Sequence, residues 1–308
     1  MRVALFGSPA FAIPTLHALN SAHELKLVVT QPDKPVGRGL KLQAPATAQA
    51  ASSLGLRLEQ PARLKKNEGF RDLIAELELD VAVTAAYGKI LPQALLDTPL
   101  HGFLNVHGSL LPKYRGAAPV QWALINGETE TGISIMQTEA GLDTGAVRHV
   151  KRLDIAPEDT AADVFNALST LGAEAILEAL DLLTKKQLPV HPQDDSAATY
   201  SPMFTKDDGR IRWDETAEAV YNRYRGVMMW PGSWTLFNNK LLKVHKLEPV
   251  SGNGQAGEVL TVDASGVVVA AAEGAVKLFE VQAPNKAKMS AADWANGYAV
   301  KPGVQLGN

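Results

Sequence analysis

The stretch Gly102–Gly116 reads GFLNVHGSLLPKYRG and is the most informative part of this chain. It opens with an apolar run typical of a buried strand and passes through Asn105 and His107 into a turn that contains Pro112. Residues two positions apart in a strand face the same way. The side chains of Asn105 and His107 are therefore expected to project together from the end of this strand.

Similar apolar runs alternate with helical patterns through the first two thirds of the chain. We expect strands at Arg2–Phe6, Leu25–Thr30, Asp80–Thr84, Gly102–Val106, Gly132–Gln137 and Ala146–Arg152, and helices near Phe11–Asn20, Ala44–Leu54, Glu68–Leu77 and Thr160–Lys185. The last two strands are expected to form a hairpin around Asp143. This alternation predicts an α/β domain with a mainly parallel sheet, whose ligands bind outside the carboxyl ends of the strands.

The character of the sequence changes after this region. Leu188–Thr205 contains three prolines and many small or polar residues, which is typical of a linker. One helical segment near Thr216–Arg225 is followed by short, glycine-separated apolar runs, which predict a small barrel or sandwich. We therefore expect a catalytic domain at 1–189, a linker at 190–206 and a second domain at 207–308.

Composition restricts the possible functions. The 308 residues include no cysteine, which excludes disulfides, thiolate nucleophiles and iron–sulfur clusters. The net charge of −3 argues against a general nucleic-acid binder. No apolar run reaches about 18 residues, so no membrane span is expected, and a cytoplasmic protein fits best.

Asn105 and His107 are the candidate catalytic pair. An Asn amide donates hydrogen bonds to a developing oxyanion, and a His does the same or moves protons near neutral pH. The chain has no G-x-S-x-G motif, and no metal-ligand spacing surrounds His107, so no metal is expected. The alternative is that the two residues only cap a strand end.

Asp143 is a candidate third member of this site. It lies in AGLDTGAV between Gly141 and Gly145, where an Asp is most often a turn residue that accepts nearby N–H groups. The functional alternative places its carboxylate beside His107, where it orients the imidazole or takes a proton.

The sequence NVHGSLLPKYRGAAPVQWALINGETETGISIM, followed by AGLDTG, resembles the signature of the folate-dependent formyltransferases. The resemblance implies a Rossmann-like fold, 10-formyltetrahydrofolate as co-substrate, and Asn105, His107 and Asp143 as catalytic residues. It also implies folate contacts from the S-L-L-P turn and from AAYGKILP, Ala85–Pro92. The implied folate-contacting residues are Ser109, Leu110, Leu111 and Pro112 in the first segment and Tyr87, Gly88 and Ile90 in the second.

Other segments resemble the branch of this family that acts on methionyl-tRNA. These are FGSPAFAIPTL, the loop Gln31–Pro45 (QPDKPVGRGLKLQAP) and ATYSPMFTKDDGRIRWDETAEAVYNRYRG. The resemblance implies formyl transfer to the α-amino group of initiator methionyl-tRNA, a C-terminal OB-like domain, and tRNA contacts from Lys34, Arg38 and Lys41. On composition alone, the loop is equally well a solvated surface loop.

Two alternatives to this function remain. One is a formyltransferase that acts on a small amine such as an amino-sugar nucleotide, and the other is a non-catalytic folate- or RNA-binding module. A monomer is expected. Cations of the C-terminal part are expected to face the RNA backbone: Lys206, Arg210, Arg212, Arg223, Arg225, Lys240, Lys243 and Lys246.

Further expectations concern the aromatic residues of the C-terminal part and two residue pairs that differ from the family pattern. Tyr221, Tyr224, Trp230 and Trp234 are expected to pack in a core rather than to stack on bases. Thr138-Glu139 and Met228-Met229 differ from the pattern of the family. The first pair is expected to alter the lining near the active site, and the second to change packing at the start of the C-terminal domain.

Overall fold

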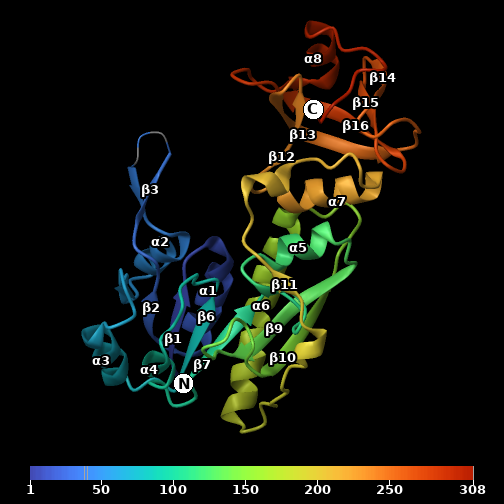
Figure 1. Ribbon diagram of the computed structural model, residues 1–308. Helices are drawn as coiled ribbons and strands as arrows, with labels where there is room; N and C mark the ends of the chain where they lie inside the picture. Colours follow the sequence, from blue (N-terminus) through green and yellow to red (C-terminus); the bar gives the residue numbers. More distant parts are fainter. Residues whose placement is uncertain (38, 40, 308) are drawn as a thin grey trace. The chain divides into compact units, whose positions relative to one another are not determined.

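The computed structural model describes residues 1–37, 39 and 41–307, which form two compact units (Figure 1). The first unit contains Met1–Pro119, Glu130–Ile155 and Val164–Pro202. The second contains Val120–Thr129, Ala156–Asp163 and the residues from Met203 on. Within the described residues, no helix has the length and apolar character that crossing a membrane requires.

The first unit is built on a seven-stranded sheet in the order β10-β9-β7-β6-β1-β2-β5. The five strands from β5 to β7 pair in parallel, whereas β9 is antiparallel to β7 and β10 to β9. The predicted mainly parallel sheet and the β9–β10 hairpin are both confirmed. The strands are β1 (Arg2–Gly7), β2 (Glu24–Val29), β5 (Leu58–Glu59), β6 (Val81–Ala85), β7 (Phe103–His107), β9 (Glu130–Gln137) and β10 (Val147–Asp154).

Continuous burial explains why the central strands are apolar throughout. Every residue of β6 is buried, as is every residue of β1 after Arg2, which is the pattern of parallel strands covered on both faces. The ring of Phe6 meets two other rings edge to face, with its centroid 5.5 Å from that of Tyr87 and 5.1 Å from that of Phe103.

The helical segments before Pro202 are η1 (Ala10–Ala12), α1 (Ile13–Ala22), α2 (Ala46–Ser53), α3 (Glu68–Glu76), α4 (Gln93–Leu96), α5 (Pro119–Ile125), α6 (Ala161–Thr184) and η2 (Asp195–Ala197).

Much of the segment expected to be a linker is hydrogen-bonded within the first unit. His191 forms an isolated bridge with Val147. Further along, β11 (Tyr200–Ser201) pairs in parallel with β8 (Arg115–Gly116). The expected boundaries 1–189, 190–206 and 207–308 stay a proposal, while packing assigns Val164–Pro202, which includes most of the expected linker, to the first unit.

The second unit contains an antiparallel sheet in the order β12-β13-β16-β15-β14, with β17 beside β16. Its core includes Trp294, which is fully buried, together with the inward-facing valines of β14, β15 and β16. An antiparallel sheet domain is confirmed, while its closure into an OB-like barrel stays a prediction. Its elements are η3 (Lys206–Gly209), α7 (Ala217–Val227), β12 (Ser233–Phe237), β13 (Lys240–Val250), β14 (Val259–Asp263), β15 (Gly266–Ala270), β16 (Ala275–Gln282), β17 (Met289–Ser290) and α8 (Ala291–Gly297).

Candidate active site

Asn105 lies in the middle of β7, beside Thr84 of β6 in the strand register. The Thr84 hydroxyl donates a 2.8 Å hydrogen bond to the Asn105 side-chain oxygen Oδ1. Since Oδ1 accepts this bond, Nδ2 is the amide atom left to donate to a bound group. Thr84 therefore sets the orientation of the amide, a role that the sequence did not reveal because it depends on which strand lies next to β7.

His107 ends β7 and is 5% exposed. Its Nε2 atom lies 3.0 Å from the backbone carbonyl oxygen of Tyr114. An imidazole nitrogen facing a carbonyl must carry the proton, so this contact places Nε2–H on the Tyr114 oxygen and leaves Nδ1 to exchange a proton. Tyr114 has a left-handed φ of 60°. This contact, and not the expected bond to Asp143, orients the ring.

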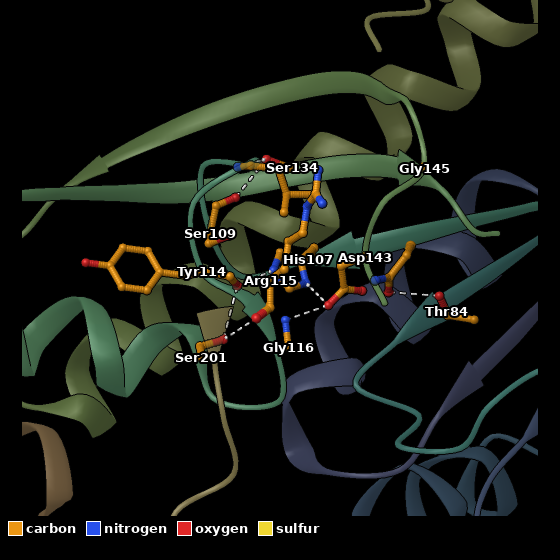
Figure 2. A network of polar contacts seen from close by, with 12 residues as sticks. Thr84, His107, Ser109, Tyr114, Arg115, Gly116, Ser134, Asp143, Gly145 and Ser201 are labelled. Carbon is orange, nitrogen blue, oxygen red and sulfur yellow. Dashed lines mark hydrogen bonds and ion pairs between the residues drawn. The ribbon is translucent and has the colours of Figure 1, made fainter. Parts of the chain in front are cut away.

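Asp143 lies in the β9–β10 turn and points at His107, as Figure 2 shows. Its Oδ2 is 3.7 Å from His107 Nδ1, which is an ion-pair separation too long for a hydrogen bond. The same Oδ2 accepts a 2.8 Å bond from the backbone N–H of Gly116. The carboxylate is thus fixed by the chain that follows the S-L-L-P turn and presents its charge to Nδ1.

The turn that carries Asp143 depends on its glycine. Asp143 has a φ of 53°, a left-handed conformation that Asp tolerates better than most residues. A side chain at Gly145 would overlap the carbonyl oxygen of Gln137. The turn and catalytic alternatives for Asp143 are therefore compatible, since the tight turn is what directs the carboxylate.

A network of partly buried hydrogen bonds, which the sequence did not reveal, holds this turn. Gln193 donates 2.8 Å bonds from Nε2 to the backbone oxygens of both Asp143 and Gly145. Its Oε1 accepts a 2.9 Å bond from Arg115, whose guanidinium is 2% exposed and also bonds Asp195 at 2.8 Å. Gln193 lies in the segment predicted to be a linker, so nothing local marked it as part of the site.

Hydrogen bonds to Lys113 and to Ser134 of β9 hold the start of the S-L-L-P turn, and Figure 2 shows the contact between Ser109 and Ser134. The fully buried Ser109 hydroxyl donates 2.7 Å to the Lys113 carbonyl, and its own carbonyl accepts 2.7 Å from the Ser134 hydroxyl. The Ser109 side chain is therefore occupied within the protein. The next three residues, Leu110, Leu111 and Pro112, are partly buried.

The second expected folate segment follows β6. The Tyr87 ring is 3% exposed within the core of the first unit, and burial raises the pKa of Tyr87 to about 12. Its backbone carbonyl accepts a 2.8 Å bond from Gln31, and a side chain at Gly88 would meet the same Gln31 amide. Ile90 is 91% exposed. Of the three, only Ile90 presents a side chain freely at the surface.

The basic loop Gln31–Pro45 is a short ribbon in which β3 (Lys34–Val36) pairs with β4 (Lys41–Gln43). Lys34 donates 2.7 Å to the Gln31 side chain, and Lys41 is exposed. Arg38 lies outside the described residues.

Two expectations for the second unit are wrong. Arg223 and Arg225 are buried, and Arg225 bonds the Asn222 side chain and the Asp159 carbonyl, so neither is a surface cation for RNA. Trp230 is 52% exposed instead of packed in the core. The expectation of core packing is correct for Tyr224, which is 7% exposed in the core of this unit.

The Thr138-Glu139 pair directly follows β9, between the start of β7 and the turn that carries Asp143. The Thr138 N–H donates 2.8 Å to the carbonyl of Phe103, the first residue of β7. Both residues line a hollow beside His101 and Gly102, before β7 begins. His107 stands at the other end of the strand, but the Glu139 side chain lies close to Gly145 in the turn that carries Asp143, so an effect of this departure on the lining of the site stays a prediction.

The fold and this site define the class of protein. Family models described as formyl transferase and as formyl transferase C-terminal domain match residues 1–180 and 203–299, and the chain belongs to the formyl transferase family.

Two curated relatives and one solved structure show which members of the family this chain is similar to. A methionyl-tRNA formyltransferase of Deinococcus radiodurans is 50% identical over 305 residues, which cover 99% of this chain and 95% of that protein. One of Thermus thermophilus is 48% identical over 307 residues, 100% of this chain and 99% of that protein. A solved N-formyltransferase from Helicobacter canadensis, in complex with folinic acid and dTDP-3-aminofucose, has a TM-score of 0.70 at 15% identity and covers 90% of this chain and 98% of that one. That structure supports the fold alone.

Proposed function

We propose that this chain transfers the formyl group of 10-formyltetrahydrofolate to the α-amino group of initiator methionyl-tRNA. The observation that carries the proposal is the meeting of an amide, an imidazole and a carboxylate at β7, with His107 Nδ1 3.7 Å from Asp143. Relatives that are 48–50% identical along nearly the whole chain and carry this activity in their names support the choice of acceptor.

The proposed reaction begins when the neutral amine attacks the formyl carbon. A new C–N bond forms, and the carbonyl oxygen becomes an oxyanion that accepts a hydrogen bond from Asn105 Nδ2. The attacking nitrogen, now positively charged, gives a proton to His107 Nδ1, and the Asp143 carboxylate stabilises the resulting imidazolium. The bond from the formyl carbon to N10 of the folate then breaks, and N10 takes the proton from Nδ1.

Folate contacts in this proposal come from the two segments that flank the site. The structure of the H. canadensis protein was solved with folinic acid, a folate derivative. The buried Ser109 hydroxyl and Tyr87 ring are engaged internally. We therefore assign their part in folate binding to backbone groups, and apolar contact to Leu110, Leu111, Pro112 and Ile90. A cytoplasmic monomer that needs no metal belongs to the same proposal.

One assay tests the proposed function against the small-amine alternative. The protein is mixed with 10-formyltetrahydrofolate and either methionylated initiator tRNA or an amino-sugar nucleotide, and formylated product is measured. We expect product with the tRNA alone. Formylation of only the sugar nucleotide would establish the alternative, and binding of both co-substrates without product would indicate a non-catalytic module.

Gln193→Leu should separate positioning from binding. The substitution keeps the side-chain size and removes the two donors that hold the Asp143 turn. Displacement of a catalytic group by about 1 Å can cost about 10²-fold. We therefore expect kcat to fall by up to that factor, with KM for the folate nearly unchanged, in steady-state formyl transfer. The control is Gln187→Leu, the same change at an exposed position; equal kcat in both variants would show that the turn holds itself.

Arg38→Ala tests the basic loop. A charge-assisted hydrogen bond contributes about 1.5–3 kcal/mol, so we expect KM for methionyl-tRNA to rise about ten-fold or more while folate affinity is unchanged. Arg63→Ala, a change of the same type at an exposed position outside the loop, is the matched control. If folate affinity falls in parallel with tRNA use, the defect lies in folding and the loop has no separate role.

A further inference from the structure

A surface pocket of about 430 Å³ lies in the second unit, where α7 ends and β12 and β13 begin. Its apolar wall consists of Met228, Met229, Trp230 and Leu241, which are 40%, 53%, 52% and 41% exposed. An exposed group of large apolar side chains is unusual on a protein surface and marks an interaction site. The volume is that of a small-molecule site.

Two lysines add positive charge to the lining of the pocket. Lys206, Lys243 and His245 line it, and none of the lining residues is an Asp or Glu. Within the described part of the chain, neither lysine ammonium has an ion-pair partner. The pocket therefore joins an exposed indole and two flexible thioethers to unpaired cations, which fits an anion that carries a flat apolar group.

The walls of this pocket are fixed by internal hydrogen bonds. Tyr224 donates 3.0 Å to the carbonyl of His245, and Trp234 donates 3.0 Å from its indole to the carbonyl of Lys206. Arg210 lies 5.9 Å above the Trp234 ring, measured to its centroid. Tyr224 is buried and Trp234 is partly buried, so Trp230, which is 52% exposed, is the aromatic side chain that offers the most surface to a ligand.

We propose that this pocket binds one unpaired nucleotide of the RNA substrate, with the base against Trp230 and the methionines and the adjoining phosphates beside Lys206 and Lys243. Unpaired bases stack on aromatic side chains, and their phosphates pair with lysines. This inference rests on the proposed function. It also gives the Met228-Met229 departure a role, because both side chains form the wall of the pocket and lie outside the core.

Affinity measurements on the full-length protein test the proposal. The dissociation constant for initiator tRNA is measured by filter retention at several salt concentrations. Trp230→Leu is expected to weaken binding about ten-fold, within the range of base–aromatic stacking, without changing the salt slope. Lys243→Gln is expected to lower the slope of log K against log salt by about one.

Two controls match these variants in the same unit. Tyr298→Leu alters an aromatic residue that is 43% exposed and does not line the pocket. Lys301→Gln removes an exposed charge elsewhere. Both are expected to bind tRNA like the wild type. The proposal is overturned if Trp230→Leu binds no more weakly than Tyr298→Leu.

A second variant, Met229→Glu, tests the proposal independently in case Trp230→Leu does not fold. Met229→Glu adds a carboxylate at a half-exposed position and is expected to weaken tRNA binding more strongly at low salt than at high salt. Unchanged affinity in this variant also overturns the proposal.

Competition identifies the occupant. A single-stranded hexanucleotide should displace tRNA from the wild type and do so poorly from Trp230→Leu, whereas a duplex of the same length should not distinguish the two proteins. Equal competition by the duplex would show that the pocket does not bind an unpaired nucleotide. A wild-type dimer in sedimentation that Trp230→Leu abolishes would show that the pocket binds a second copy of the chain instead. Failure of wild-type formyl transfer would instead remove the proposed function and leave the binding result standing.

Discussion

We expect Asp143→Asn to lower kcat/KM for formyl transfer by about 10²–10⁴-fold, the range for loss of general acid–base assistance. The Asn side chain has nearly the same shape, and its oxygen can still accept the N–H of Gly116 that now bonds Asp143 at 2.8 Å. What disappears is the negative charge 3.7 Å from His107 Nδ1. The proton leaving the amine then has no carboxylate to stabilise it on the imidazole.

Single-turnover formyl transfer measures this effect apart from product release. The thermal midpoint and folate affinity of Asp143→Asn should stay close to those of the wild type, because the contacts that hold the turn remain. These are the Gly116 bond at the side chain and the Gln193 bonds to the backbone. A loss smaller than about five-fold would mean that His107 handles the proton without Asp143, which would assign the Asp to the turn alone.

The sequence is a good guide to local structure and to residues within one element. Continuous apolar runs predict the buried strands β1 and β6 because burial on both faces leaves no polar alternation. The spacing of Asn105 and His107 in β7 follows from the two-residue period of a strand. The glycine-flanked bend predicts the β9–β10 hairpin and its turn.

Contacts between distant segments are beyond a local pattern. Thr84 reaches Asn105 only because β6 lies next to β7, and Gln193 reaches the Asp143 turn from 50 residues away. The Tyr114 carbonyl that orients His107 is a backbone group, which no side-chain motif identifies. Core packing is the usual fate of an aromatic residue, whereas the exposure of Trp230 depends on where α7 ends.

Asn105→Ala is the second variant for which we expect a large effect, a loss of about 10²–10³-fold in kcat with folding intact. This is the usual cost of removing one oxyanion donor. Asn105 is only partly buried, so its truncation removes little packing from β7, and the one bond lost is that from the Thr84 hydroxyl. KM for both co-substrates should change little, because the donor acts on charge that develops in the transition state.

Thr84→Val gives the matched comparison for this variant. It keeps the branched shape of a buried residue and removes the hydroxyl that fixes the Asn105 amide. If Asn105 Nδ2 stabilises the oxyanion, Thr84→Val should lower kcat by a smaller factor, since the amide is still present but free to rotate away from the formyl oxygen. The double variant should then be no slower than Asn105→Ala, because Thr84 acts through the amide that is already gone. Additive losses, or wild-type turnover in Asn105→Ala, would assign the oxyanion to another donor.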